Sequence, residues 1–189
     1  MGLSLVTRAE YKSYAGLTSP TQDNVIDALL PKVSALVKTL CRRTFIDYAA
    51  TPKVEYFDGG NYEYIPEESP VIAVTSLAYS TDYGVTYTDL VEFTDYAISK
   101  VNGNVRSLTS AGFPSTVNGY RLTYTGGYAT LPEDLKLAIF DIITYYMKND
   151  SAMHSSKAPS GSVQIEYVTN TSLPAHIKRV LDQYTSSYS

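Results

Sequence analysis

Two histidines, one cysteine and an adjacent pair of glutamates are the side chains of this sequence that could support catalysis or metal binding. His154 and His176 have no sequence partner at a zinc-ligand spacing, and the chain contains no HExxH motif. A serine nucleophile is not indicated, because no GxSxG motif is present and the acids near either histidine form no recognisable triad. We therefore expect no metal, no cofactor and no catalytic centre.

The cysteine and the paired glutamates favour structural roles as well. Cys41 has no second cysteine to pair with and falls on the apolar side of a helical pattern, so we expect a buried, unreactive thiol. Glu67 and Glu68 could act as a general acid and base. They lie between Pro66 and Pro70 in a segment with loop character, so we expect both carboxylates to be solvated.

Paired glycines between a strand and a helix, in "YTGGYATLPEDLK", have the placement of a phosphate-binding loop. The lysine and hydroxyl residue of the phosphate-loop motif do not follow Gly126 and Gly127. Glu133 and Asp134 already place negative charge at the positive end of the helix dipole, where they would repel a phosphate. We interpret the segment as a structural corner, in which Gly126 and Gly127 permit positive φ and Pro132 begins the helix.

The composition argues against several classes of protein. The chain has 189 residues and a net charge of −4, which does not favour a dedicated nucleic-acid-binding domain. No stretch has the hydropathy of a membrane span or the pattern of a signal peptide, so we expect synthesis in the cytoplasm and no membrane partner. The 18 tyrosines suit interfaces. The segment from Val54 to Ser99 contains no lysine or arginine but many acids, and it should repel polyanions.

Hydrophobic periodicity indicates an α+β fold, a small helical bundle with an inserted antiparallel β region. Thr7 and Glu10 have the spacing of a capping box, and "VNGNV" predicts a hairpin turn. Pro31 predicts a bent second helix. That helix should bury one apolar stripe of Val25, Ile26, Leu29, Val33, Leu36, Val37 and Leu40. We expect a single domain over 1–189, with helices at 8–15, 20–43, 132–148 and 174–186, β structure at 53–125, a flexible connector at 149–162 and a late strand at 162–168.

Several segments together resemble one known family. These are "LVTRAEYKSYAGL", "DALLPKVSALVKTLCRRTF", "EYFDGG", "YTGGYATLPEDLKLAIFDIITYY" and "LPAHIKRVLDQY", and they cover most of the chain in order. They resemble the head-tail connector, or head-completion adaptor, family of tailed bacteriophages. The long tyrosine-rich insertion and the connector at 149–162 depart from the shorter members of that family.

The resemblance implies a non-enzymatic virion protein of the neck. Such a protein forms a ring, usually of twelve copies, docks on the portal protein and joins it to the tail, a stopper or a nozzle protein. It extends the channel through which the genome leaves, so DNA passes without specific binding.

We expect two sets of residues to serve that role. The acids that face the channel would be Glu63, Glu67, Glu68, Asp82, Asp89 and Glu92. The residues that dock on the portal would be Ile177, Arg179, Val180, Tyr184 and Tyr188.

Two alternatives remain at this point. Another neck component, such as a stopper or tail-completion protein, would be more purely β, and the two long amphipathic helices argue against it. A small hydrolase or ligand-binding domain would use the acidic loops and would need convergent polar groups in a closed pocket.

Overall fold

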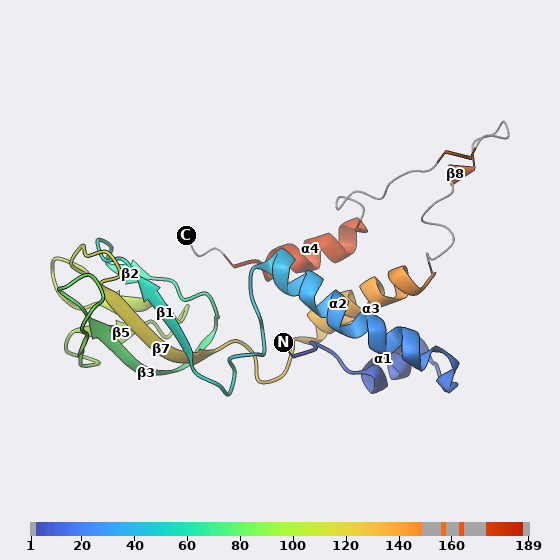
Figure 1. The fold of residues 1–189 in the computed structure, drawn as a ribbon, viewed down its shortest axis with the longest axis horizontal. Helices are drawn as coiled ribbons and strands as arrows, with labels where there is room; N and C mark the ends of the chain where they lie inside the picture. The colour runs from blue at the N-terminus through green and yellow to red at the C-terminus, as the bar shows by residue number, and fades with distance from the viewer. Residues whose placement is uncertain (1–2, 149–155, 158–162, 165–172, 187–189) are drawn as a thin grey trace. The chain divides into compact units, whose positions relative to one another are not determined.

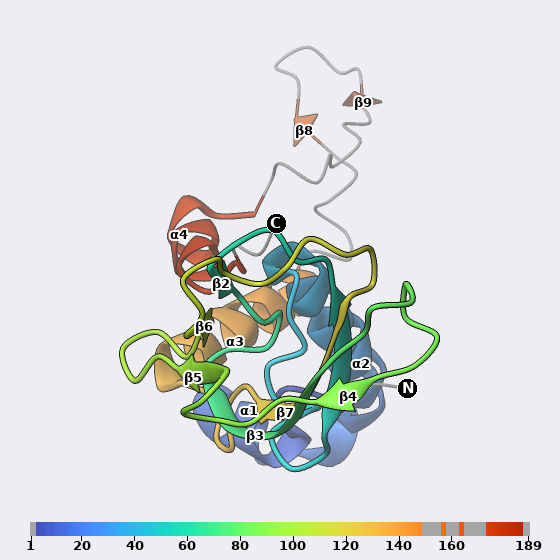
Figure 2. The same cartoon turned by 90° about the vertical axis from the view of Figure 1, so that its left-hand side faces the viewer.

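The computed structural model describes residues 3–148, 156–157, 163–164 and 173–186 (Figure 1). These residues form two compact units: a helical unit within Met1–Cys41 and Leu131–Thr185, and a β unit over Arg42–Thr130. The predicted α+β fold and the insertion of β structure between helices are confirmed (Figures 1 and 2). That the chain is one connector domain stays a prediction.

The helical unit contains four α-helices with recognisable ends. They are α1 (Arg8–Ala15), α2 (Asp23–Cys41), α3 (Glu133–Lys148) and α4 (Ala175–Gln183), and the 3-10 turn η1 (Pro20–Gln22) leads into α2. The capping box is confirmed, since the Thr7 N–H donates to Glu10 Oε2 at 2.8 Å and the Glu10 N–H donates to Thr7 Oγ1 at 3.3 Å. Gly16 ends α1 at a φ of 65°.

Helix α2 continues through Pro31, and the stripe that it buries agrees only in part with the predicted one. Val25 and Leu40 were expected in the core but are 51% and 40% exposed. The buried stripe overlaps the predicted one at Ile26, Val33 and Val37 and is rotated by roughly 70° toward Leu30 and Cys41. The aliphatic core of the unit joins α2 to α3 and α4 through Ile26, Leu30, Val33, Val37, Leu135, Ile139, Ile142, Ile143, Ile177 and Leu181.

The β unit consists of two antiparallel sheets. The larger has the order β1-β7-β3-β4 and the smaller the order β2-β6-β5. Strands β5 and β6 are the hairpin predicted from "VNGNV". The strands are β1 (Lys53–Phe57), β2 (Glu63–Tyr64), β3 (Val71–Tyr79), β4 (Thr88–Asp89), β5 (Tyr96–Ile98), β6 (Val105–Ser107) and β7 (Tyr120–Gly126).

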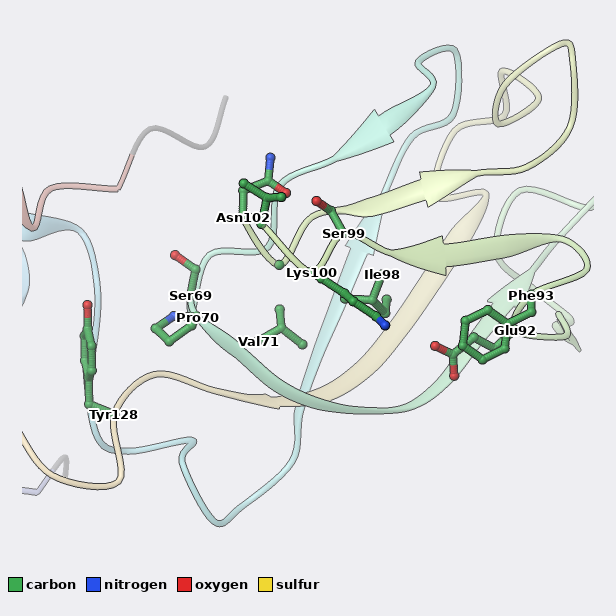
Figure 3. Close-up of a pocket in the computed structure, with 12 residues that line it drawn as sticks. Ser69, Pro70, Val71, Glu92, Phe93, Ile98, Ser99, Lys100, Asn102 and Tyr128 are labelled. Atoms are coloured by element: carbon green, nitrogen blue, oxygen red, sulfur yellow. The ribbon is translucent and has the colours of Figure 1, made fainter.

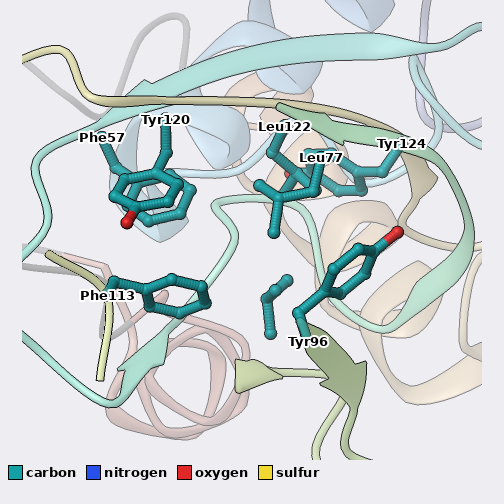
Figure 4. Close-up of a cluster of buried hydrophobic side chains, with 8 residues drawn as sticks. Phe57, Leu77, Tyr96, Phe113, Tyr120, Leu122 and Tyr124 are labelled. Atoms are coloured by element: carbon teal, nitrogen blue, oxygen red, sulfur yellow. The ribbon is translucent and has the colours of Figure 1, made fainter. Parts of the chain in front are cut away.

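The core of the β unit is aromatic (Figure 4). Alternate residues of β7, Tyr120, Leu122 and Tyr124, point inward and are at most 1% exposed. Tyr120 stacks on Phe57, with 4.9 Å between ring centroids, and meets Phe113 edge-on at the same distance. Part of the tyrosine excess is therefore used for internal packing.

The late part of the chain is described only in pieces. Strands β8 (Ser156–Lys157) and β9 (Val163–Gln164) pair antiparallel. The strand predicted at 162–168 is described at 163–164, and the rest of it lies outside the described residues. The connector predicted at 149–162 also lies outside them, except for 156–157.

Candidate interaction surfaces

The described residues offer no catalytic constellation. Among them, no group of three or more histidine, cysteine or acidic side chains could hold a metal ion. His176 Nε2 lies 3.5 Å from Asp141 Oδ2 on an exposed surface, and His154 lies outside the described residues. Cys41 is buried, as predicted, and its thiol donates to the Leu181 carbonyl at 3.5 Å. None of the helices in the described part is long and apolar enough to cross a membrane.

The two glycines of the predicted corner serve different purposes. Gly127 has the predicted positive φ, 93°, and a Cβ there would lie 2.1 Å from the Phe45 carbonyl oxygen. Gly126 does not have a positive φ, so that part of the prediction was wrong. It is needed for close approach, because a Cβ would lie 2.3 Å from the Glu68 carbonyl oxygen. Pro132 precedes α3 and accepts the Lys136 N–H at 3.0 Å.

Glu68 is not a solvated acid, which corrects the prediction. Its side chain is buried, and the residue is 1% exposed. The carboxylate accepts the Thr44 N–H at 2.8 Å and the Phe45 N–H at 3.3 Å. Its own N–H donates to the Tyr124 hydroxyl at 2.9 Å. Because the loop folds onto the backbone of residues 44 and 45, the carboxylate satisfies buried donors and cannot face a channel.

A second buried carboxylate, Glu55, joins Glu67 to the same polar network. Glu55 accepts the Tyr124 hydroxyl at 2.6 Å and Lys53 Nζ at 2.9 Å, and Lys53 also pairs with Glu67. Burial lowers the pKa of Lys53, but its contacts with Glu67 and Glu55 outweigh that effect and raise it overall. Burial and the bond to Glu55 raise the pKa of Tyr124. Lys53 thus stays charged and Tyr124 protonated, which suits packing better than base or nucleophile chemistry.

The remaining predicted channel acids lie on separate elements. Glu63 in β2 accepts the Asn104 amide at 2.7 Å. Asp82 lies in the loop after β3, while Asp89 in β4 and Glu92 in the next loop are exposed. The structure therefore does not gather these acids into one cluster within the chain.

Sequence reasoning missed a set of exposed apolar side chains on the β unit. They sit mainly at turns. Single exposed apolar residues are ordinary, but several that lie together can mark a surface that binds a partner. The sequence does contain an indication of this exposure, because these apolar residues lie between glycine, aspartate and threonine in predicted loops. The most exposed are Tyr83 at 73%, Val85 at 80%, Phe93 at 78% and Val101 at 96%.

The predicted portal-docking set is divided by the structure. Ile177 is 1% exposed and belongs to the helical core, so its prediction as a docking residue was wrong. Arg179 is exposed and Val180 is half-buried on α4. The Tyr184 hydroxyl donates to Asp134 Oδ1 at 2.7 Å. Tyr188 lies outside the described residues.

Comparison with solved structures shows where this fold occurs. The chain is similar to chains in the neck of an empty gene transfer agent (GTA) particle computed with C6 symmetry, with a TM-score of 0.58 and 16% identity. It is equally similar in fold to a chain in the virion of the native GTA particle, with a TM-score of 0.58 and 15% identity. These two matches cover 98% of this chain and 91% of the others.

A chain in the neck of the native GTA particle, computed with C12 symmetry, gives a TM-score of 0.57 at 17% identity and covers 100% of this chain and 97% of the other. No curated protein matches the chain. The head completion protein family matches residues 4–186. Because that match spans nearly the whole sequence, the chain belongs to the head completion protein family.

Proposed function

We propose that this protein is a ring-forming adaptor between the head and the tail of a virion. Twelve copies would dock on the portal protein, extend its DNA channel and provide the platform for the tail or the next neck protein. The observation that carries the proposal is the family match over residues 4–186, which includes both the helical unit and the β unit. The fold shared with a chain from a neck computed with C12 symmetry supports a ring.

The exposed acids supply a reason why DNA would pass without binding. Asp89 and Glu92 are exposed, and the segment from Val54 to Ser99 contains no lysine or arginine, although Lys100 lines the same groove as Glu92. Carboxylates on a channel wall repel phosphates, which is the opposite of the lysine and arginine contacts that hold DNA. Within this proposal Glu68 has no place on the wall, because it is buried.

The exposed surface of α4 is the proposed portal contact. Deleting 173–189 would test this poorly, because Ile177 and Leu181 are core residues at 1% and 3% exposure. The substitution Arg179→Glu reverses one exposed charge and leaves the core intact. We expect it to weaken portal binding by about tenfold, and unchanged binding would remove Arg179 from the contact.

Negative-stain images of the purified protein, alone and mixed with its portal, test the proposed function. A ring stacked on the portal supports it. A protein that never associates with the portal, yet binds the tail end of the neck, would instead be another neck component.

A further inference from the structure

The β unit has an open groove beside the start of β3 (Figure 3). Its volume is about 440 Å³. In Figure 3, Pro70, Val71 and Ile98 occupy its centre, Phe93 lies at one end and Tyr128 at the other. Its floor is apolar, while Glu92, Lys100 and Asn102 add polar groups to its lining, which suits a loop that carries both apolar and polar side chains.

Two turns form the rim of the groove. Gly103 has a φ of 74°, and a Cβ there would lie 3.2 Å from the Val71 nitrogen, so the hairpin loop that carries Val101 rests directly on β3. Phe93 has a φ of 63°, and its N–H donates to the Tyr96 carbonyl at 2.7 Å. These turns hold Val101 and Phe93 exposed, although both side chains are apolar.

A loop with two exposed large side chains, Tyr83 and Val85, follows the other end of β3. Residues 80–87 turn around Asp82, whose carboxylate accepts the Val85 N–H at 3.1 Å and the Thr86 N–H at 2.8 Å. The Ser80 hydroxyl accepts the Gly84 N–H at 2.9 Å. Hydrogen bonds from Ser80 and Thr86 lower the pKa of Asp82 to about 2, so the loop keeps this charge at neutral pH. The tip presents Tyr83 and Val85 outward.

The floor of the groove and the loop lie at different ends of β3. Pro70 and Val71 line the groove at the beginning of β3, whereas the loop follows Tyr79 at its end. The nine-residue strand places Pro70 and Val71 about 27 Å from the loop. Phe93 is nearer to the loop, because it follows β4, which pairs with the end of β3. A head-to-tail contact requires two different patches on each copy, because ring closure uses unlike surfaces. The groove and the loop are two such patches.

The charges of the two ends are complementary. Lys100 is exposed on the groove, and Arg106 is exposed on the adjoining strand of the same hairpin. The loop end carries Asp82 and, just beyond it, the exposed Asp89. Glu92 also lines the groove, so the hairpin side keeps one acid beside its two cations.

We propose that the loop of residues 81–87 from one copy docks into the groove of the next copy. Tyr83 and Val85 cover Phe93, Val101 and the apolar floor, and Lys100 faces the acidic side of the loop. This contact rests on the proposed ring and names the surfaces that close it.

Paired cysteines test the contact in the assembled complex. The variant Val85→Cys/Val101→Cys is made in a Cys41→Ser background, assembled with the portal protein and treated with a short bismaleimide cross-linker. We expect a ladder of covalent oligomers extending to the full ring on a denaturing gel. Each single-cysteine variant should give no species larger than a dimer, because only a head-to-tail contact joins the two positions repeatedly.

The two proposals fail in different ways. Rings on the portal that yield no ladder overturn this contact and leave the adaptor function intact. If no rings form, both the proposed function and the proposed contact are contradicted.

A pair of surface variants gives a second readout. Val101→Asp places a charge on a side chain that is 96% exposed, so the fold tolerates it. Ring assembly should fall at least tenfold, since a buried unpaired charge opposes association. The matched control, Val54→Asp, lies on β1 outside both surfaces and should assemble normally. Equal behaviour of the two variants overturns the proposed contact.

Discussion

The helical unit and the β unit place their polar and apolar groups in opposite ways. The helical unit has an aliphatic core, and its ion pairs lie toward the surface, such as Arg8 with Asp27 at 2.6 Å. The β unit buries two carboxylates, Glu55 and Glu68, inside an aromatic core. Most of the exposed large hydrophobic residues of the described chain belong to the β unit, while the helical unit exposes Leu3, Tyr14, Val25, Leu40 and Leu137.

In the β unit, buried groups stabilise the loops, and exposed apolar side chains on those loops are available to bind a partner. The hydrogen bonds of Glu55 and Glu68 join distant loops of the β unit and restrict their conformation. Among the described residues, buried side-chain atoms of Arg43 and Thr44 have no hydrogen-bond partner. Apolar side chains at the tips of fixed loops can then bind a partner without a large cost in conformational entropy. The described part of the helical unit exposes fewer large apolar side chains, which suits a structural support more than a binding surface.

The largest expected effect comes from Gly127→Ala. A Cβ would meet the Phe45 carbonyl oxygen at 2.1 Å in a backbone with a φ of 93°, so we expect a loss of at least ~3 kcal/mol in the free energy of unfolding. Gly16→Ala in the helical unit is the matched control, because its φ is 65° but nothing lies within 4 Å. It should cost about 1 kcal/mol. Urea unfolding followed by circular dichroism measures both, and equal losses would contradict a tightly packed corner.

Glu68→Ala should be the next most damaging change. It leaves the Thr44 and Phe45 N–H groups buried without an acceptor, which costs about 3 kcal/mol in the free energy of unfolding. Arg8→Ala removes an exposed ion pair of the helical unit and should cost less than about 1 kcal/mol. The same urea titration compares them. Similar losses in the free energy of unfolding for the two variants would contradict the distinction between buried and surface charges.

Thr7→Ala tests the helical unit. It removes the side-chain acceptor of the Glu10 N–H, and we expect a loss of about 1 kcal/mol in the free energy of unfolding. Thr18→Ala, at an exposed position outside the helices, serves as the control and should change it little. Thermal unfolding measures the stability of both variants. A Thr7 variant as stable as the control would show that the cap does not stabilise the helix.

The smallest effect concerns the pH response of the loop at Asp82. Its pKa is lowered to about 2 by hydrogen bonds from Ser80 and Thr86. A lowered pKa means that these bonds support the loop fully above the ordinary value of 3.8 and are lost as the pH falls through about 2. A carboxyl NMR titration should find this midpoint, and Ser80→Ala should raise it. A midpoint unaffected by Ser80→Ala would contradict the hydrogen-bonded turn.

Local signals in the sequence predicted the elements that are stabilised locally. The capping box at Thr7 and Glu10 placed α1, and "VNGNV" placed the hairpin of β5 and β6, because in both cases the partners are within a few residues. The strand that leads to Gly127 was predicted from its aromatic and β-branched residues, although its partners β1 and β3 are distant in the sequence.

Long-range partners explain the errors. Glu68 looked solvated because its neighbours are prolines and serine, but its partners are backbone groups 24 and 23 residues away at Thr44 and Phe45. The pattern of α2 did not reveal which of its apolar residues face α3 and α4, so Val25 and Leu40 were assigned to the core. Exposure at Val101 and Phe93 could not be read from residue type, since burial is the ordinary state of such side chains.

Cryo-electron microscopy of the protein bound to its portal tests the adaptor role most directly. We predict a closed ring of twelve copies stacked on the portal around a continuous channel. A complex with no ring, or a ring that does not contact the portal, would contradict the proposed function.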